Sequence, residues 1–144
     1  MRELFKSVIC VRYGADEPLP DWSQVKEGKL SSALNAPQPV FGFDKYPTVE
    51  AKAAVLLYSV AKAHALPNGN KRTAMVTTFF FLAANDKWWS AESEDVRAHV
   101  AWLAASEARA RDEALAYMTK YLGARLIDVG RDALLALPLP MPPR

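Results

Sequence analysis

A short polar run between two apolar stretches holds the side chains best suited to phosphate chemistry. Gly69 permits positive φ and close backbone approach, Lys71 adds a compact charge, and Arg72 can form a two-pronged pair with phosphate oxygens. His64 comes shortly before them, and imidazole is the side chain that exchanges a proton most readily near neutral pH. The spacing predicts a phosphate-binding turn beside a candidate general base for a hydroxyl that attacks phosphorus.

The same residue types also have a plain structural interpretation. Asn-Gly is a common turn, Asn70 can simply cap a helix, and Lys71 and Arg72 in an exposed first turn usually face solvent. A lone histidine on an apolar helix face is more often a core residue than a catalyst. Short motifs also occur by chance, so the residue types alone leave both interpretations open.

The chain before the turn predicts a helix that delivers His64. Pro47 suits its first turn, or the Thr48 hydroxyl can cap it, and Glu50 complements the positive helix end. Apolar residues recur at steps of three and four up to His64, which puts His64 on the inward face at the C-terminal end. Pro67 then stops the helix, because proline lacks an N–H group and restricts the residue before it.

The chain after the turn predicts a second helix over residues 71–84, whose apolar residues cover almost its whole circumference. A helix that is apolar all round is buried, so we expect it to be the central helix. Its N-terminus meets the turn, where free N–H groups and the helix dipole attract anions. Phosphate is the ligand that such a site favours.

The residues before the first of these helices predict a flap. Prolines and a glycine between residues 36 and 45 disfavour a helix, so we expect an irregular flap or a short hairpin there. Its apolar side chains, Val40, Phe41 and Phe43, could dock a target chain alongside the site.

The remaining elements follow from apolar spacing and from residues that begin or end helices. Residues 4–13 fit a short helix, although a strand remains open for residues 8–11, and residues 27–35 can form one or two helical turns. Downstream, we expect a helix capped by Ser90 or Ser93 with Val96, Val100 and Leu103 inward, a helix from Asp112 to Gly123 with Leu115, Met118, Tyr121 and Leu122 inward, and a weaker helix over residues 125–137.

The composition indicates one globular domain. The chain has 144 residues, of which 51% are hydrophobic and 24% charged, which suits a single domain with its own core. We assign residues 1–137 to this domain and residues 138–144 to a proline-rich C-terminal tail. The 18 basic residues exceed the 16 acidic residues by only 2, so no direct nucleic-acid partner and no anionic membrane surface are expected.

The sequence also favours a cytoplasmic location. Cys10 is the single cysteine and can form no internal disulfide, which fits a reducing compartment. The first residues lack the apolar core of a signal peptide, and no stretch approaches the roughly 18 to 20 apolar residues of a membrane span. We therefore expect no membrane association.

The turn and its flanks resemble the signature of the Fic/Doc family. That signature is a histidine, usually followed by proline or another apolar residue and an aromatic, then two residues, Gly/Ala-Asn, Gly/Lys and Arg. The matching run is His64-Ala65-Leu66-Pro67-Asn68-Gly69-Asn70-Lys71-Arg72-Thr73-Ala74, and further similarity lies in Arg12-Tyr13-Gly14, in residues 29–38 and in Tyr46-Pro47-Thr48.

The resemblance implies an all-α fold, a Fic-like helical bundle with a buried central helix-loop-helix motif and a short flap. It also implies roles for the motif residues. His64 would be the general base and Gly69 would let the backbone approach the ligand. Asn70 would help to hold the phosphate nest, and Lys71 and Arg72 would bind phosphates.

Lys71 is similar to the lysine of the Doc branch, whereas Fic adenylyltransferases usually have glycine at this position. The resemblance therefore implies a Doc-like toxin of a toxin–antitoxin pair, with ATP and Mg²⁺ as cofactors. Such a toxin phosphorylates a hydroxyl of a translation elongation factor, and a separate antitoxin protein restrains it. The resemblance therefore favours control by this separate partner over control by an internal inhibitory helix.

Three positions depart from the family pattern. Leu66 replaces a usual phenylalanine, and Ala65 replaces a frequent proline. Asn68 stands where many members carry an acidic ligand of Mg²⁺, and an amide oxygen brings no negative charge, so metal affinity should be weaker. Two alternatives therefore remain: Fic-type AMP transfer to a protein hydroxyl, which Lys71 disfavours, and a catalytically weak Fic-fold binding protein.

Overall fold

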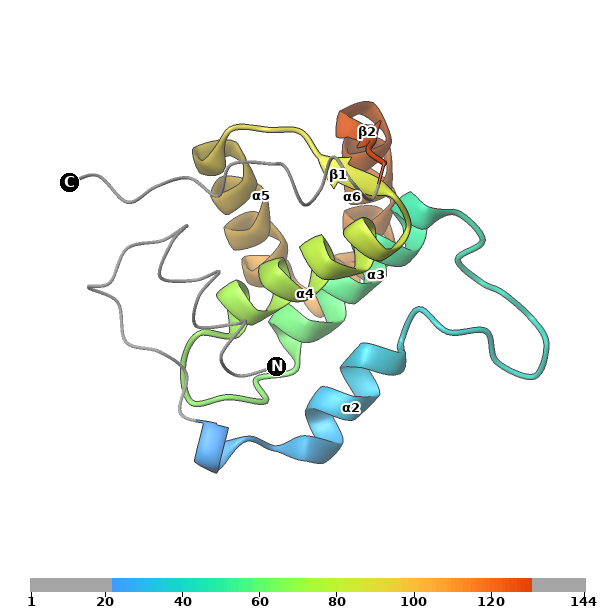
Figure 1. Ribbon diagram of the computed structural model, residues 1–144. Coiled ribbons are helices and arrows are strands. Elements are labelled where there is room, and N and C mark those ends of the chain that lie inside the picture. Colours follow the sequence, from blue (N-terminus) through green and yellow to red (C-terminus); the bar gives the residue numbers. More distant parts are fainter. Residues whose placement is uncertain (1–21, 131–144) are drawn as a thin grey trace.

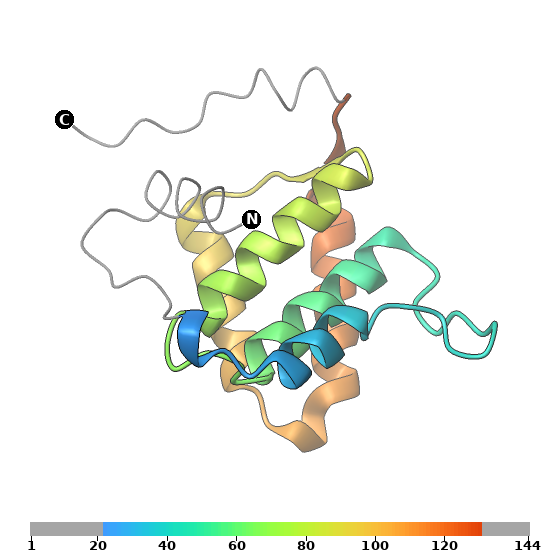
Figure 2. The ribbon, with the colours of Figure 1, turned by 60° about the horizontal axis from the view of Figure 1, so that its bottom comes forward.

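Two neighbouring helices, α3 (Val49–Lys62) and α4 (Asn70–Ala84), run in opposite directions through the middle of the molecule (Figure 1). The computed structural model describes residues 22–130. Helix α2 (Glu27–Asn35) lies along α3, and α5 (Ser93–Ala105) and α6 (Arg111–Arg125) pack on its other sides (Figure 2). The other elements are the short 3₁₀ helices η1 (Trp22–Gln24) and η2 (Ala108–Ala110) and the strands β1 (Lys87–Trp89) and β2 (Leu126–Asp128). The described residues thus form the predicted all-α bundle.

The central helix is α3. Of its 14 residues, eight are buried, and it contacts α2, α4, α5 and α6. In α4, by contrast, Phe80 is 43% exposed and Phe79 and Phe81 are only partly buried. The prediction that residues 71–84 form the central helix is therefore wrong. Consecutive helical residues point about 100° apart, so three aromatic residues in a row cannot all face one core.

The start of α3 matches its sequence signals. The Thr48 hydroxyl accepts a hydrogen bond from the backbone N–H of Ala51 at 3.2 Å, and Thr48 is the N-cap residue. Glu50 lies in the first turn, where a negative charge offsets the positive end of the helix dipole. The threonine cap is therefore confirmed.

The core joins α3 and α4 to α5, α6 and the strand pair. All side chains predicted to point inward from α5 and α6 are buried. The largest fully buried side chains include Leu57, Leu82, Trp89, Leu103, Met118 and Leu122.

None of the helices within residues 22–130 has both the length and the apolar character that a membrane span needs.

Two predicted helix ends differ from the structure. Glu92 is the N-cap residue of α5 and Ser93 is already helical, so neither predicted serine caps this helix. Helix α6 continues through Gly123 to Arg125. Gly123 faces Glu50 of α3, and a Cβ atom built on it would lie 3.5 Å from the Glu50 Cγ atom. A Cβ atom at this distance would make an ordinary van der Waals contact, so Gly123 neither ends the helix nor is required by its packing on α3.

A small antiparallel strand pair replaces the start of the helix predicted over residues 125–137. Strand β2 pairs with β1, so that Trp88 lies opposite Ile127 and Trp89 opposite Leu126. This pairing gives the backbone of β2 hydrogen-bond partners and places Trp89 in the core. These two gains outweigh the local preference of residues 126–128 for a helix. Residues 129 and 130 are not helical either. Residues 131–137 of that predicted helix, the helix predicted over residues 4–13, Cys10 and the tail over residues 138–144 lie outside the described residues.

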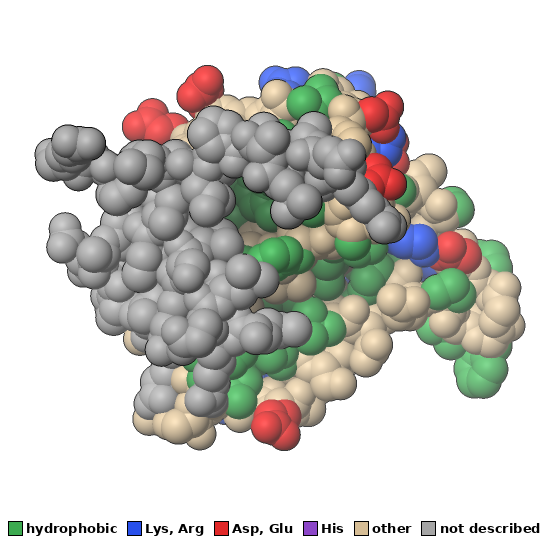
Figure 3. Space-filling view, in the orientation of Figure 1, with side chains coloured by type: hydrophobic (Ala, Val, Ile, Leu, Met, Phe, Trp, Pro, Cys, Tyr) green, Lys and Arg blue, Asp and Glu red, His purple; other side chains and the backbone are tan. Residues whose placement is uncertain are grey.

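The flap, residues 36–45, is irregular and contains one β-bridge between Val40 and Phe43. Phe41 and Gly42 at its tip both have positive φ, 49° and 76°, as tight hairpin turns require. Apolar side chains stand out over this segment at the right-hand edge of Figure 3. The prediction of a flap or short hairpin is confirmed.

Candidate active site

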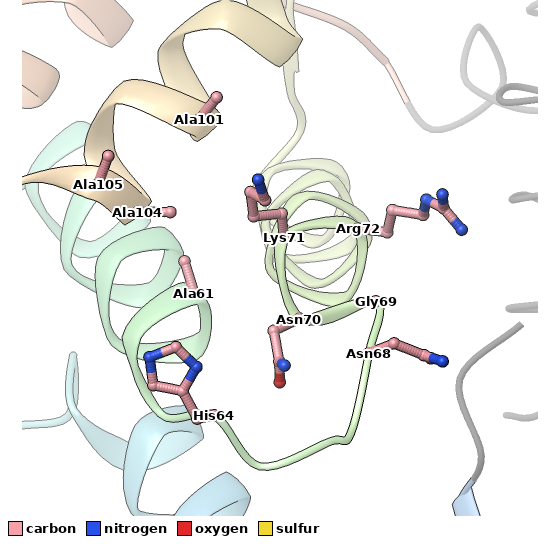
Figure 4. A pocket seen from close by; sticks show the side chains of 10 residues that line it. All are labelled: Ala61, His64, Asn68, Gly69, Asn70, Lys71, Arg72, Ala101, Ala104 and Ala105. Carbon is pink, nitrogen blue, oxygen red and sulfur yellow. The ribbon is translucent and has the colours of Figure 1, made fainter. Parts of the chain in front are cut away.

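The predicted motif residues surround one hollow of about 400 Å³. His64 and residues 68–72 line it, so the structure brings together every motif side chain singled out in the sequence (Figure 4). Ligand pockets in proteins commonly measure about 300 to 1,000 Å³, so a small phosphorylated ligand fits the size of this hollow. The remaining walls are Ala61 from α3 and Ala101, Ala104 and Ala105 from α5.

His64 does not sit on the inward face of a helix, as the spacing predicted. Helix α3 ends at Lys62, Ala63 is its C-cap, and His64 follows with a left-handed φ of 46°. The helix therefore ends before Pro67, and the His64 side chain is exposed at the pocket. A left-handed residue after a helix is usually glycine or asparagine. Histidine also adopts this conformation more often than most residues, and here it turns the side chain toward the hollow.

The motif loop, residues 63–69, is fixed by Asn70. The Asn70 Oδ1 atom accepts a hydrogen bond from the Leu66 N–H at 3.0 Å, and its Nδ2 atom donates to the Leu66 carbonyl at 2.8 Å. Figure 4 shows the Asn70 side chain directed toward the loop. Asn70 therefore shapes the loop through the backbone of Leu66, and its predicted role in binding phosphate stays a prediction.

The loop is also anchored by apolar side chains beneath it. Ala65 and Leu66 are buried, so an aliphatic residue does serve as anchor at the position where phenylalanine is usual. The Ala65 carbonyl accepts a hydrogen bond from the Lys26 N–H at 2.8 Å, which ties the loop to the start of α2. These contacts anchor the loop to the core and to the start of α2.

Helix α4 presents a positive N-terminus to the hollow. Gly69 is its N-cap residue with φ 73°, and no side chain caps it. The first turn of α4 contains no acidic residue, so no carboxylate in that turn offsets the helix dipole. The Thr73 hydroxyl donates to the Gly69 carbonyl at 2.9 Å and fixes the turn. An anionic group is the ligand that such a helix end favours.

The charged side chains leave α4 on two sides. In Figure 4, Lys71 points toward the alanines of α5, on the same side as His64, whereas Arg72 and Asn68 point to the opposite side of the helix axis. Lys71 and His64 therefore lie on one side of the α4 N-terminus, and Arg72 and Asn68 lie on the other. An extended polyphosphate could contact both sides of the helix end.

The residues that line the hollow do not form a magnesium site by themselves. Asn68 offers one amide oxygen, and no Asp or Glu lines the hollow. Residues 22–130 contain no group of three or more His, Cys, Asp and Glu side chains that could hold a metal. Mg²⁺ prefers carboxylate and phosphate oxygens, so phosphates of a ligand would have to supply most of its ligands.

The flap lies away from this hollow. Val40, Phe41 and Phe43 do not line it, and Figures 1 and 2 both show the flap at the end of α3 opposite to the motif loop. A helix of 14 residues is about 21 Å long at about 1.5 Å per residue. The expectation that the flap lies alongside the site is thus not met, and its docking role stays a prediction.

The alanine wall of α5 was missed in the sequence. Ala101, Ala104 and Ala105 follow the helical steps of three and four residues, so they were recognisable as one face of a helix. Nothing in that spacing says that this face lies beside the motif loop. Only the packing of α5 across α3 and α4 makes it a wall of the hollow.

Comparison with known proteins identifies the class. The profile of the Fic/DOC family matches residues 5–82, more than half of the chain, and the chain belongs to this family. It is similar to Toxin Doc of Mycolicibacterium smegmatis, with 44% identity over 98 residues that cover 67% of this chain and 72% of that protein. No solved structure matches the chain significantly. Membership of the family implies a transferase activity on proteins.

Proposed function

We propose that the chain is a Doc-like toxin of a toxin–antitoxin pair, which transfers the γ-phosphate of ATP to a hydroxyl of a translation elongation factor in the cytoplasm. The observation that carries the proposal is the shared hollow, in which His64 and Lys71 face one side of the α4 N-terminus. The likeness to a protein named Toxin Doc supports the toxin role and an antitoxin partner.

The proposed reaction uses His64 as the general base. The hydroxyl oxygen of the target forms a bond to the γ-phosphorus, and the imidazole of His64 takes the hydroxyl proton. The bond from the γ-phosphorus to the bridging oxygen breaks, and ADP leaves with its electron pair. The exposure of His64 at the pocket lets a target side chain approach it directly.

The nucleotide phosphates would lie over the N-terminus of α4. Lys71 and Arg72 would bind them, and Gly69 would let the backbone come close. ATP would enter as its magnesium complex, since Asn68 is the one metal-binding candidate among the side chains that line the hollow. The alanine wall would leave room for the uncharged part of the nucleotide.

Lys71 is the residue that favours phosphoryl transfer over AMP transfer. Its side chain extends toward α5, into space that a glycine would leave open (Figure 4). A positive charge and added volume at this point restrict which phosphate of the nucleotide can sit in the nest. Lys71 therefore favours a γ-phosphate next to the attacking hydroxyl.

Two separate labels on ATP test the reaction class. The protein is incubated with purified elongation factors and ATP labelled either on the γ-phosphate or on the adenine. Only the γ-label should appear on the acceptor protein. Transfer of the adenine label would establish AMP transfer instead, and transfer of neither label would refute the proposed activity toward these acceptors.

The second candidate is a Fic-fold binding protein with little catalysis, and the absence of a carboxylate from the lining of the hollow favours it. Replacement of Asn68 by Asp separates the two. If the chain is an enzyme, Asn68→Asp should preserve or raise transfer and lower the Mg²⁺ concentration needed for half-maximal rate. If both wild type and Asn68→Asp transfer no label, the binding role is favoured.

A further inference from the structure

Lys62 joins the two helices whose ends meet beside the hollow. It is the last residue of α3 and comes two residues before His64. Its Nζ atom donates a hydrogen bond to the backbone carbonyl of Ser106, the C-cap residue of α5. Ala104 and Ala105, which directly precede Ser106, form part of the wall of the hollow. The hydrogen bond therefore ties the helix that delivers His64 to the helix that forms the wall.

The surroundings of the Lys62 ammonium group suit a cation. Carbonyl groups at the C-terminus of a helix carry a negative partial charge, which a lysine side chain offsets. The Nζ atom also lies 5.7 Å from the centroid of the Tyr58 ring, and Tyr58 is buried in α3. The Ser106 hydroxyl donates to the Leu103 carbonyl at 2.6 Å and closes the last turn of α5. One contact within α3 and one across to α5 therefore fix the ammonium group.

The wall residues themselves give the end of α5 little hold. Ala101 and Ala105 are exposed and Ala104 is only partly buried, and an alanine side chain has little apolar area to bury. Leu103 anchors the same stretch of helix in the core. None of residues 104–106 is buried, so the end of α5 beyond Leu103 depends on polar contacts, of which the one from Lys62 reaches α3.

The alanine wall differs in chemistry from the rest of the hollow. Its residues, Ala61, Ala101, Ala104 and Ala105, offer methyl groups but no side-chain donor, acceptor or charge. A phosphate needs donors or cations, which the α4 N-terminus and Lys71 offer and the wall does not. Lys71 extends from α4 toward this wall (Figure 4). A flat and largely apolar group, such as a nucleobase, suits the wall better than a phosphate does.

The position of α5 sets how closely the wall can contact such a group. A gap of about 0.5 to 1 Å already removes roughly a quarter to a half of the attraction between apolar atoms. Alanine has no side-chain rotamers, so the wall cannot close a gap without movement of the helix backbone. The end of α5 must therefore be held in place for the wall to contribute to binding.

We propose that Lys62 is a positioning residue for the nucleotide: it holds the end of α5 so that the alanine wall packs against the nucleoside of ATP and distinguishes ATP from inorganic polyphosphates. This inference rests on the proposed function, because it takes ATP as the ligand of the hollow. Lys62 does not line the hollow and acts on the ligand through Ser106 and the wall.

The experiment measures the binding of two ligands by calorimetry in the presence of Mg²⁺. They are the β,γ-imido analogue of ATP and inorganic tripolyphosphate, which carries the phosphates without the nucleoside. The variants are Lys62→Met, the conservative Lys62→Arg, and Lys120→Met as a charge-matched control at an exposed position of α6. Ala101→Leu fills the hollow at the wall, and Ala98→Leu adds the same side chain at an exposed position of α5 outside the lining. Urea unfolding verifies that each variant folds, and Lys62→Gln replaces Lys62→Met if the latter does not.

Wild type should bind the ATP analogue more tightly than tripolyphosphate. Lys62→Met should weaken binding of the analogue about fivefold and of tripolyphosphate less than about twofold, and Lys62→Arg should restore most of the loss. Ala101→Leu should weaken the analogue about tenfold with the same selectivity, and both controls should behave as wild type.

A lysine with a merely structural role would lower the free energy of unfolding when replaced, but leave the ratio of the two affinities unchanged. An unchanged ratio in Lys62→Met, or equal affinity of wild type for both ligands, would therefore overturn the inference. Unchanged binding of the analogue to Ala101→Leu would also overturn it, because the wall would then not contact the nucleoside.

Binding is measured without an acceptor, so this inference and the proposed reaction can fail separately. The expected pattern of affinities, with no γ-label on any acceptor, would refute the reaction and support the role of Lys62. Transfer of the γ-label, with a ratio of affinities that Lys62→Met leaves unchanged, would do the reverse. Failure of the wild type to bind the ATP analogue would overturn both.

Discussion

The motif loop and the flap lie at opposite ends of α3, and they are held in different ways. The motif loop rests on buried side chains, with both ends of the Asn70 amide bonded to the backbone of Leu66. The flap is fastened at its base by Lys52 and exposes its tip. The loop contains a strained histidine and many polar groups, whereas the tip carries apolar side chains.

This difference indicates two separate tasks. A reacting group must be held within a fraction of an ångström, which buried anchors and paired hydrogen bonds provide. A docking surface tolerates a looser tip, provided that its position relative to the body is set. Replacing residues at the two ends of α3 should therefore affect different quantities, namely rate and stability at the loop, and KM for the acceptor at the flap.

The largest effect is expected at His64. His64→Ala should lower the rate of phosphoryl transfer about 10²- to 10⁴-fold, because the general base is lost. His99→Gln, in the other histidine of the chain, should keep the rate within a few-fold. Single-turnover transfer from γ-labelled ATP measures both, and a growth-arrest assay reports the same order in cells. Full activity of His64→Ala would remove the reason to place the chemistry at the loop.

The next effect concerns Asn70 and is a change of stability as well as rate. Asn70→Ala removes two hydrogen bonds and leaves the N–H and carbonyl of Leu66 unpaired, so the free energy of unfolding should fall by about 1–3 kcal/mol. Asn68→Ala, on the exposed part of the loop, should change it by less than about 0.5 kcal/mol. Urea unfolding of wild type, Asn70→Ala and Asn68→Ala measures these free energies. Equal stability of the three proteins would contradict a loop fixed by Asn70.

A smaller and more selective effect is expected at the flap. Replacing Phe41 and Phe43 by serine should weaken modification of the acceptor more than nucleotide binding, and leave the free energy of unfolding within about 0.5 kcal/mol of wild type. The reason is that both side chains are exposed and contribute little to the core. Acceptor titrations and nucleotide calorimetry on the same preparation test this. An equal loss of acceptor modification and of nucleotide binding would mean that the flap also supports the nucleotide site.

The sequence predicted those parts of the site that depend on neighbours in the chain. Thr48 begins α3, Gly69 turns the chain into α4, and the polar residues between them converge on one hollow. These features follow from local chemistry, namely a hydroxyl cap, a positive φ and free helix N–H groups. The flap over residues 36–45 was equally local, since prolines and a glycine exclude a helix there.

The parts that could not be predicted depend on contacts between distant residues. The left-handed conformation of His64 is not recorded in the apolar spacing of α3, and Asn70 and Leu66 close the loop that follows it. Glu50 of α3 lies beside Gly123 of α6. Lys52 ties Pro37 and Asp44 to the first turn of α3. A sequence pattern records none of these contacts.

The smallest expected effect is the titration of Asp44, and it tests directly whether Lys52 holds the two stems of the flap, at Pro37 and Asp44. The hydrogen bonds from Lys52 lower the pKa of the Asp44 carboxyl below its ordinary value, and the Tyr46 N–H adds to this. A carboxyl whose folded pKa is depressed contributes stability above its unfolded pKa of about 3.9, and this contribution is lost as the pH falls through the folded pKa.

The ion pair of Lys52 and Asp44 should therefore persist at neutral and weakly acidic pH and open only below about pH 4. NMR detection of the side-chain carboxyl carbons should show Asp44 titrating at lower pH in the wild type than in Lys52→Met. Overall stability should change little between the two proteins, because the ion pair is partly exposed. If Asp44 titrates at the same pH in both, Lys52 does not hold the stems in solution. The flap would then differ from the motif loop in being free at its base as well as at its tip.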